Sequence, residues 1–498
     1  MEFARIRNLF TLLLFVFWLN AIAVLAGPYT ETGDTALRHD LEYLADRGLV
    51  STPITTWPMS WADVATALDS VDRQPIKNPT ILRLLNRLDA RVANSTRWGI
   101  LISSYEVGAY ENLDELRTFD KRQKGKFALD SRLSYVGRNF VANVQLGLID
   151  DRVDSNSVRL DGSYIGYLYK NTAILAGSLE SWWGPGHAGS LILSSNARPV
   201  PGVTIRRNVA TPFTMPVLRH LGPWSAQIFA RRMETDRGVS NPYLLGARVT
   251  IKPFRSLELG VSRTAQWGGE GRPESFSSLI DLIIGQDNVG EGVTREDEPG
   301  NQLAGFDARW SLNRFGVPIT AYGQFIGEDE AGGFPSRYLG MGGLSTSFAW
   351  SPTQSTVRVN LEYSDTTCQF NESSRLFNCA YANGLYPSGY RYRGRAIGHS
   401  TDSDSSQLAL IATVNSAEAS SWQAMIRRGK LNRGGPPDSS HSLSATRQDY
   451  VDAELVNARP FRGGQLKVGI GFRDGETVES GQTDRETRYF INWRSRPH

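Results

Sequence analysis

The segment with the densest binding chemistry covers residues 181–207, SWWGPGHAGSLILSSNARPVPGVTIRR. Trp182 and Trp183 offer flat apolar faces of the kind on which sugar rings stack. The segment also contains Arg198, Arg206 and Arg207. The planar guanidinium of arginine has two parallel donors that match a carboxylate in bidentate fashion. Because glycine and proline recur throughout, we interpret this segment as a long loop that carries binding groups between regular strands.

Two other segments repeat this combination of aromatic and charged residues. The turn 267–273, WGGEGRP, carries Trp267, Glu270 and Arg272. The segment 386–395, YPSGYRYRGR, alternates tyrosine with arginine. Stacking and hydrogen bonds hold sugars, and arginine adds ion pairs to acidic sugars. Any one of these residues could instead pack within the protein, but as a set they favour contact with an acidic glycan.

Catalytic and metal-binding patterns are weaker. The six histidines show no metal-ligand spacing, and the sequence contains no G-x-S-x-G nucleophile motif. Acidic runs at 296–298 and 402–404 contain the oxygen ligands that Ca²⁺ prefers, but such runs are usually solvated. Two carboxylates that met across loops could cleave a glycoside, although spacing cannot show this. We therefore predict no cofactor, no metal ion and no catalytic residue.

The composition is typical of a β-rich wall rather than of a helical enzyme. The 498 residues include 48 Gly, 21 Phe, 18 Tyr and 12 Trp, but only 6 Met. Mean hydropathy is negative although 10% of the residues are aromatic, which suits a wall with one apolar and one wet face. The net charge of +3 is too near neutral for electrostatic binding of nucleic acid.

From Trp98 to Trp493 the hydrophobic pattern has a period of two. Apolar and polar residues alternate most clearly in the segments 140–148, 356–365, 450–455 and 465–473. Each segment has about the length that a tilted β-strand needs to cross a bilayer. No segment after residue 26 has the ~20 consecutive apolar residues of a membrane-spanning helix.

The connections between these segments alternate in length. Short turns are expected near 137–138, 170–171, 222–223, 252–255 and 313–316. Long loops are expected near 181–210, 267–302, 327–337, 366–405 and 430–446. This alternation predicts an all-β transmembrane barrel of about 18 antiparallel strands, whose two ends lie on the periplasmic side. A secreted β-sandwich or a β-propeller is the alternative, but the first does not need this alternation and the second should show repeats of ~40–50 residues.

The N-terminus indicates export. Arg5 and Arg7 precede an apolar run that ends near Ala26, which predicts a secretory signal peptide over residues 1–26. An uncleaved membrane anchor is the alternative. In an oxidising compartment we expect Cys368 and Cys379 to form a disulfide within a loop, with two free thiols as the alternative.

From Asp34 to about Val92 the hydrophobic pattern has a helical period. Asp34, Ser60 and Asn78 are placed to cap three short helices. Because about 60 residues make a marginal core when alone, we expect this small bundle to plug the periplasmic end of the barrel. The three predicted parts are the signal peptide, the helical bundle over 27–96 and the barrel over 97–498.

Several long runs resemble the Wzi family of capsule-assembly proteins. They are LRHDLEYLADRGLV, TTWPMSW, SWWGPGHAGSLILSSNARPVPG, SLELGVSRTAQWGGEGRPESFSS, EPGNQLAGFDARW and YGQFIGEDEAGGFPS. The resemblance implies an eighteen-stranded outer-membrane barrel of a Gram-negative bacterium, closed at its periplasmic end by helices. It also implies a lectin that holds capsular polysaccharide at the cell surface. Binding roles carried over loop by loop fall on Trp182, Trp183, Arg198, Arg206, Trp267, Glu270 and Arg272.

The resemblance defines the expected partners as well. We expect a monomer in contact with outer-membrane lipids and an acidic surface polysaccharide, without nucleic acid and without enzymatic activity. A porin or transport channel is the first alternative, and an enzyme acting on envelope glycans or lipids is the second. The loop around Cys368 and Cys379, the segment 390–395 and the ending 494–498 depart from the family pattern, so the identity of the glycan stays open.

Overall fold

The computed structural model describes residues 28–112, 114–120, 125–150, 154, 156–284, 300–314, 316–331, 334–350, 353–435 and 441–497. The predicted signal peptide lies outside these ranges. None of the helices in the described part is long and apolar enough to cross a membrane.

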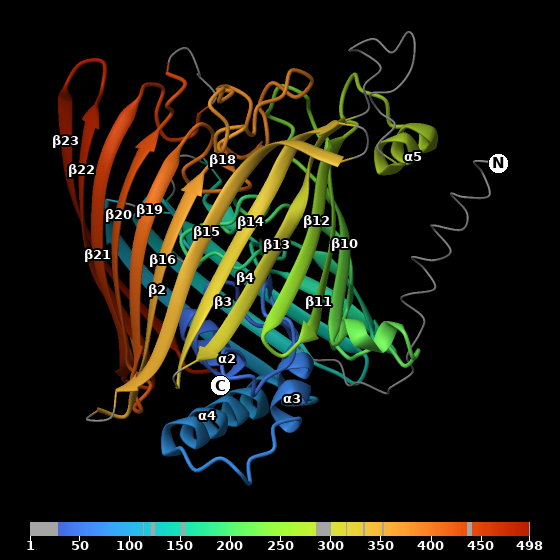
Figure 1. Cartoon of the computed structure of the whole chain (residues 1–498), viewed down its shortest axis with the longest axis vertical. Helices are drawn as coiled ribbons and strands as arrows, with labels where there is room; N and C mark the ends of the chain where they lie inside the picture. Colours follow the sequence, from blue (N-terminus) through green and yellow to red (C-terminus); the bar gives the residue numbers. More distant parts are fainter. Residues whose placement is uncertain are drawn as a thin grey trace.

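A closed barrel of antiparallel strands forms most of the molecule (Figure 1). Its strands are β2 (Leu101–Glu111), β3 (Phe127–Val136), β4 (Phe140–Ile149), β5 (Val158–Arg159), β6 (Tyr164–Tyr169), β7 (Thr172–Gly177), β9 (Gly202–Arg207), β10 (Trp224–Arg232), β11 (Tyr243–Phe254), β12 (Leu257–Trp267), β13 (Gly300–Arg314), β14 (Val317–Ala331), β15 (Phe334–Trp350), β16 (Ser355–Asp365), β19 (Ser406–Asn415), β20 (Ser421–Leu431), β21 (Gln448–Phe461), β22 (Gly464–Thr477) and β23 (Gln482–Ser495). The last strand pairs with the first, with Phe490 opposite Tyr110. The short strands β5 and β6 both pair with β4, so together they count as one strand of the wall. The barrel therefore has the predicted eighteen strands.

The period-two pattern separates an apolar outer face from a polar inner face. On β16, Leu361 and Tyr363 are 45% and 44% exposed, whereas Asn360 and Glu362 are buried. The same alternation continues around the wall, where Ile174, Val249 and Leu410 are also exposed. An exposed apolar belt on every side of a barrel is the surface that lipid covers.

Short turns gather at one end of the barrel and long loops at the other (Figure 1). Two expected connections differ in kind from the structure. Residues 222–223 are not a turn between strands but the end of the connection 208–223, which contains a short 3-10 helix, η1 (Leu218–Leu221). Phe213 of this connection stacks on Trp224 of β10. The expected long loop 327–337 is instead a continuation of β14 and β15, which pair as far as Ala331 and Phe334.

Three helices precede the barrel as predicted. They are α2 (Thr35–Ala45), α3 (Trp61–Asp69) and α4 (Pro79–Ser95). The side chains of Asp34, Ser60 and Asn78 each accept a hydrogen bond from a first-turn N–H, as N-caps do. Figure 1 shows α2 within the barrel and α3 and α4 across its lower end, the end with the short turns.

The helix α2 buries charged residues against the inner wall. At its C-cap, Asp46 accepts hydrogen bonds from Arg358 Nη2 at 2.7 Å, Ser311 Oγ at 2.9 Å and Thr320 Oγ1 at 2.8 Å. Arg309 completes this set with an ion pair to Asp46. A buried carboxylate needs such partners to offset the cost of its dehydration, so the position of α2 is fixed by the wall of the barrel.

Candidate functional site

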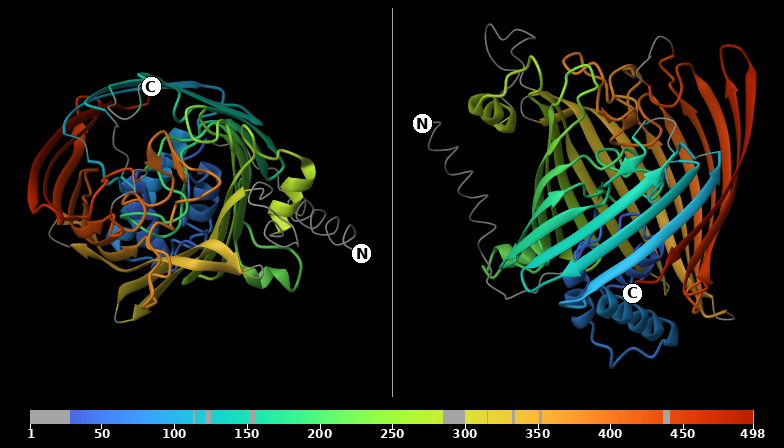
Figure 2. Two further views of the ribbon diagram at one scale, coloured as in Figure 1. Left: turned by 90° about the horizontal axis from the view of Figure 1, so that it is seen from above. Right: turned by 180° about the vertical axis from the view of Figure 1, so that it is seen from behind.

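Long segments from the loop end fold back into the barrel. In the view along the barrel axis (Figure 2, left), the orange segment 366–405 lies inside the ring of strands. The segment 178–201 also runs inside, because Trp182–Trp183 forms the short strand β8, which pairs with β1 (Thr56–Trp57) of the helical segment. The lumen is therefore occupied from both ends.

The two inward segments are fastened to each other. Tyr381 Oη donates to the carbonyl of Leu191 at 2.6 Å, and Tyr390 Oη donates to that of Ile192 at 2.9 Å. Their side chains share an apolar cluster with the inner wall, which includes Trp183, Leu191, Ile192, Tyr381, Tyr390 and Ile397. This core gives the outer surface of the loops a rigid base.

The predicted stacking platforms, Trp182 and Trp183, are fully buried. Trp182 packs edge-on against Phe119 within the apolar cluster of the helical segment, and Trp183 packs against Phe229 of β10. A ring with 0% exposure has no face for a sugar. The prediction that these two tryptophans contact polysaccharide is therefore wrong, and they join the helical segment to the loops.

Arg206 also lies away from the loops. It belongs to β9, which starts at Gly202 and runs toward the helical end, so the predicted loop 181–210 ends too late. The guanidinium carbon of Arg206 lies 4.7 Å from the ring centre of Tyr29 in the N-terminal segment. Arg206 is buried there and cannot reach a ligand at the loop end.

Arg198 does lie in the inward segment, but the protein itself supplies its carboxylates. Its Nε and Nη2 bind Asp161 at 2.9 Å and 2.8 Å, and it also pairs with Asp154. This bidentate pair is the geometry predicted for an acidic sugar. Arg198 thus links the segment 178–201 to the connection between β4 and β6.

Trp267, at the end of β12, points out of the barrel. Glu258, Ser262 and Gln266 of this strand are buried inside, and successive side chains alternate between the two faces. The ring of Trp267 lies 5.6 Å from that of Tyr243 on the neighbouring strand, and its Nε1 donates to Ser278 Oγ of α5 (Phe276–Ile284). An outward aromatic pair at the rim is typical of the membrane interface rather than of a sugar site.

The turn after Trp267 does face outward at the loop end. Glu270 is exposed and Arg272 is half-buried, with its guanidinium carbon 5.8 Å from the ring centre of Tyr386. Tyr386 Oη donates to the carbonyl of Gly268 at 3.1 Å. Burial raises the pKa of Tyr386 to about 12. Of the predicted binding residues, Glu270 and Arg272 are those that the structure leaves accessible at this end.

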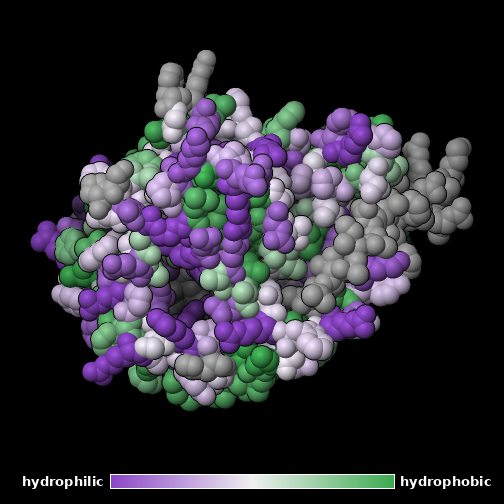
Figure 3. Space-filling model, turned by 90° about the horizontal axis from the view of Figure 1, so that it is seen from below, coloured by the Kyte–Doolittle hydropathy of each residue, from purple (hydrophilic) through white to green (hydrophobic). Residues whose placement is uncertain are grey.

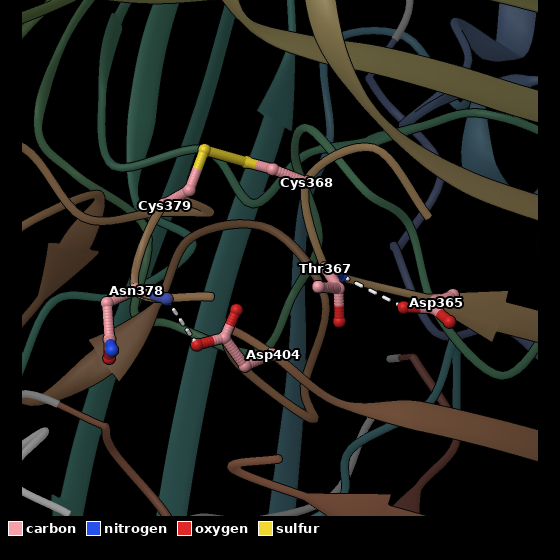
Figure 4. Close-up of a disulfide and its surroundings, with 6 residues drawn as sticks. All are labelled: Asp365, Thr367, Cys368, Asn378, Cys379 and Asp404. Carbon is pink, nitrogen blue, oxygen red and sulfur yellow. Dashed lines mark hydrogen bonds between the residues drawn. A yellow bond between two sulfur atoms is a disulfide. The ribbon is translucent and has the colours of Figure 1, made fainter. Parts of the chain in front are cut away.

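Sequence reasoning missed an exposed aromatic tip among the loops that the structure describes. Cys368 and Cys379 form a disulfide that closes the segment between them (Figure 4). Within it, Phe377 is 43% exposed, and the side chain of Arg375 is 39% exposed. The signal was present in the run Arg-Leu-Phe between the two cysteines.

Both ends of this closed segment are fixed. The N–H of Asn378 donates to Asp404 Oδ2 at 2.7 Å, and the N–H of Thr367 donates to Asp365 Oδ1 at 3.0 Å (Figure 4). The disulfide and these two bonds leave the tip little freedom. An exposed Arg and Phe on a fixed tip form a suitable surface for stacking and hydrogen bonding to sugars.

The acidic run 402–404 is part of the scaffold. Asp402 binds Arg391 through both oxygens, at 2.7 Å and 2.8 Å. Burial would raise the pKa of Asp402, but Arg391 outweighs burial and holds this pKa below its usual range. In the described part of the chain no group of three His, Cys, Asp or Glu side chains could hold a metal ion. The other acidic run, 296–298, lies outside the described residues.

Comparisons with known proteins agree with this architecture. A family model described as the capsule assembly protein Wzi matches residues 101–488. An uncharacterized 55.8 kDa protein from the cps region of Klebsiella pneumoniae is 36% identical over 339 residues, which make up 67% of this chain and 64% of that protein. The match thus covers less than two thirds of the Klebsiella protein.

A solved structure resembles the whole molecule. It is Wzi of Escherichia coli, described as an outer-membrane protein involved in group 1 capsule assembly and as a carbohydrate-binding β-barrel. The two structures superpose with a TM-score of 0.81 at 26% identity, over 93% of this chain and 98% of the other.

Proposed function

Because the chain belongs to the Wzi family of capsule assembly proteins, we propose that it is a lectin that holds capsular polysaccharide at the loop end of its barrel. It is an outer-membrane β-barrel, with its apolar belt in contact with lipid. The observation that carries the proposal is the fixed, exposed set of arginine, glutamate and phenylalanine side chains at the loop tips. Beneath these tips, packed side chains fill the lumen of the barrel.

The contact residues in this proposal are Glu270, Arg272, Arg375 and Phe377. A loop that is already ordered loses little conformational freedom when it binds, so weak contacts suffice. A long polymer repeats such contacts along its length, and avidity multiplies their effect. Arginine on the tips favours an acidic polysaccharide.

The orientation and the parts of the chain follow from this function. Residues 27–96 would close the periplasmic end, residues 97–498 would form the barrel, and residues 1–26 would be removed on export. The loops then face the cell surface, where a capsule lies. A monomer suffices, because one barrel carries the complete set of tips.

We favour binding over transport and over catalysis. A porin needs an open lumen, whereas α2 and the two inward segments occupy this one. Carboxylate pairs at the loop end, such as Asp402 with Arg391 and Asp161 with Arg198, hold the scaffold together. Purified protein in a planar bilayer should therefore conduct poorly.

The direct test is capsule retention on cells that produce the double variant Arg375→Gln/Phe377→Ala. We expect more polysaccharide to be released into the medium, with the barrel folded and present in the outer membrane. Phe461→Ala is the matched control, because Phe461 is similarly exposed (41%) but ends β21 at the opposite end of the barrel. If the double variant retains as much polysaccharide as the parent, this tip is not the binding surface.

A further inference from the structure

The end of the chain forms part of a surface that the proposed function does not use. The last strand, β23, ends at Ser495, and the N–H of Arg496 then donates to the carbonyl of Gly463 at 3.0 Å. Gly463 lies in the turn that joins β21 to β22, at the helical end of the barrel. The ending that departs from the family pattern therefore begins against this turn.

Trp493 lies on the outer wall of the barrel beside the same turn. Side chains two positions apart on a strand share a face, and Ile491 is 52% exposed in the apolar belt. The indole Nε1 of Trp493 donates to the carbonyl of Phe461 at 3.1 Å. A methyl group at Gly464 would overlap the indole ring, so the ring lies directly on the wall at this glycine. A tryptophan at the edge of an apolar belt marks the level at which lipid headgroups begin.

Three arginines are exposed around this turn, namely Arg459, Arg462 and Arg496. Arg459 faces outward, because its neighbour Ala458 lines a cavity on the inside of the barrel. In the register of the sheet, Arg459 lies opposite Leu466 and Leu466 lies opposite Trp493, so all three belong to one row of the outer wall. The other two arginines belong to the turn and to the residue that is bonded to it. The three guanidinium groups thus come from one corner of the outer wall.

These three arginines form no ion pair with an aspartate or a glutamate in the part of the chain that the structure describes. Exposed basic residues at the loop end differ, because Lys430, Arg447 and Arg485 each pair with a carboxylate. The guanidinium groups at the turn are therefore available to an external anion.

The rest of the rim at the helical end is basic as well. Exposed basic residues of other connections at this end are Arg138, Lys170, Arg219 and Arg255. In the sequence of these connections, Glu418 is the one acidic residue. Seen from this end, hydrophobic side chains lie beside hydrophilic ones along the edge of the molecule (Figure 3). A basic rim that borders an apolar belt attracts the anionic headgroups of a membrane.

We propose that the outer wall around Arg459, Arg462 and Arg496 is a binding site for an anionic glycerophospholipid. The arginines bind the phosphate diester of the headgroup, for which a guanidinium is well suited. Trp493 covers the glycerol region, and the acyl chains continue along the apolar belt. This site goes beyond the proposed function, because it lies on the membrane-facing wall at the end opposite the loop tips.

The position of the site determines the kind of lipid. Lipid A also carries phosphate groups, but it belongs to the leaflet at the cell surface. The leaflet on the periplasmic side of an outer membrane consists of glycerophospholipids. Placing the site in that leaflet rests on the orientation given under the proposed function, whereas the binding of the lipid in solution does not.

A triple variant tests the site, with a control that removes the same charge elsewhere. The test variant is Arg459→Gln/Arg462→Gln/Arg496→Gln. The control is Lys430→Gln/Arg447→Gln/Arg485→Gln, whose side chains are 58%, 52% and 70% exposed at the loop end. Each mature protein is purified in a neutral detergent and mixed with palmitoyl-oleoyl phosphatidylglycerol, with phosphatidylethanolamine of the same acyl chains, or with lipid A. Native mass spectrometry over a series of lipid concentrations gives the Kd of each lipid.

We expect the parent to bind phosphatidylglycerol at least about fivefold more tightly than phosphatidylethanolamine, because one basic residue near an anionic lipid contributes about this factor. The test variant should bind phosphatidylglycerol at least about tenfold more weakly, since it lacks three such residues, while the control binds as the parent does. Heat-modifiable migration in electrophoresis shows whether each variant is folded, and the comparison of the two phospholipids on the parent needs no variant.

Four results would overturn the proposal. They are equal affinity of the parent for the two phospholipids, unchanged affinity in the test variant, an equal loss in the control, and a larger loss for lipid A than for phosphatidylglycerol. Capsule retention by the test variant, measured in parallel, reports on the loop tips and is expected to be unchanged.

Discussion

Asp46 accepts a 2.7 Å hydrogen bond from Arg358, although 312 positions separate the two residues in the chain. One ends the helix α2 and the other projects inward from β16. Burial would raise the pKa of Asp46, but Arg309 and Arg358 outweigh it and hold this pKa well below its usual range. This contact makes the helical segment part of the barrel rather than an appended domain.

The first prediction concerns this contact. Asp46→Ala leaves Arg309 and Arg358 buried without their main partner, and breaking a buried pair in this way costs about 3–5 kcal/mol. We expect the helical segment to be cleaved faster in limited proteolysis while the barrel still runs as a folded species. Asp72→Ala, at an exposed position, should leave the cleavage rate unchanged. Equal rates in the two variants would show that Asp46 does not hold α2.

The second prediction concerns pH. Burial raises the pKa of Asp63 to about 6, although hydrogen bonds from Ala210 and Thr52 lower it. Because the folded form holds this proton more tightly than the unfolded form, the stabilisation is complete below about pH 4 and is lost as pH rises through 6. The total is about 3 kcal/mol for a shift of this size.

Asp63→Asn should remove that pH dependence. We expect the difference in protease resistance between parent and variant to change between pH 4 and pH 7 and to be flat above that range. The pKa of Glu42 is lowered by His187 and Arg38, and that of Asp46 by Arg309 and Arg358, in both cases despite burial. These two carboxylates titrate below this window and are present in both proteins. A difference that stays constant from pH 4 to pH 7 would contradict the assignment.

The third prediction concerns the packing of the two inward segments. Gly189 lies so close to His399 that a methyl group at position 189 would overlap the histidine ring. Gly189→Ala should therefore push the segments 178–201 and 366–405 apart and destabilise their packing by about 1–3 kcal/mol. We expect lower polysaccharide affinity and faster hydrogen exchange in both segments. Gly342→Ala, whose nearest neighbour is 3.7 Å away, is the control that should change neither.

The fourth prediction concerns the disulfide. Replacing both Cys368 and Cys379 by Ser frees the tip that carries Arg375 and Phe377, so ordering it on binding costs more. We expect polysaccharide to bind up to roughly tenfold more weakly, equivalent to about 1.4 kcal/mol, with the melting of the barrel unchanged. Dithiothreitol should weaken polysaccharide binding by the parent protein and leave binding by the Ser variant unchanged. If the Ser variant instead fails to form a folded barrel, the disulfide stabilises the barrel rather than the binding tip.

Much of the fold could be predicted because it depends on local patterns. Alternation predicted both ends of β16 to within one residue and the start of β22 to within one residue, although β22 runs on to Thr477, past its predicted end at Arg473. The caps Asp34, Ser60 and Asn78 act within their own helices, so sequence alone locates them. The cysteines are close in sequence, and the structure joins them.

The site was harder to predict because it depends on contacts between distant segments. Trp182 has the right chemistry for sugar, but its pairing with Trp57 of the helical segment buries it, and no local pattern reveals that partner. For Trp267, the register of β12 decides the face, and a shift of one residue would reverse it. Arg198 has the donor geometry that an acidic sugar would need, but Asp161 and Asp154 already bind its guanidinium, and both lie in a different connection of the chain.

The ion pair between Glu31 and Arg494 has a consequence for the order of assembly. These residues lie 463 positions apart, and Arg494 belongs to the strand that seals the seam against β2. Glu31, which precedes the barrel, thus gains this partner only when β23, the strand that closes the barrel, has arrived. Closure of the seam and this last contact of the N-terminal segment should therefore occur together.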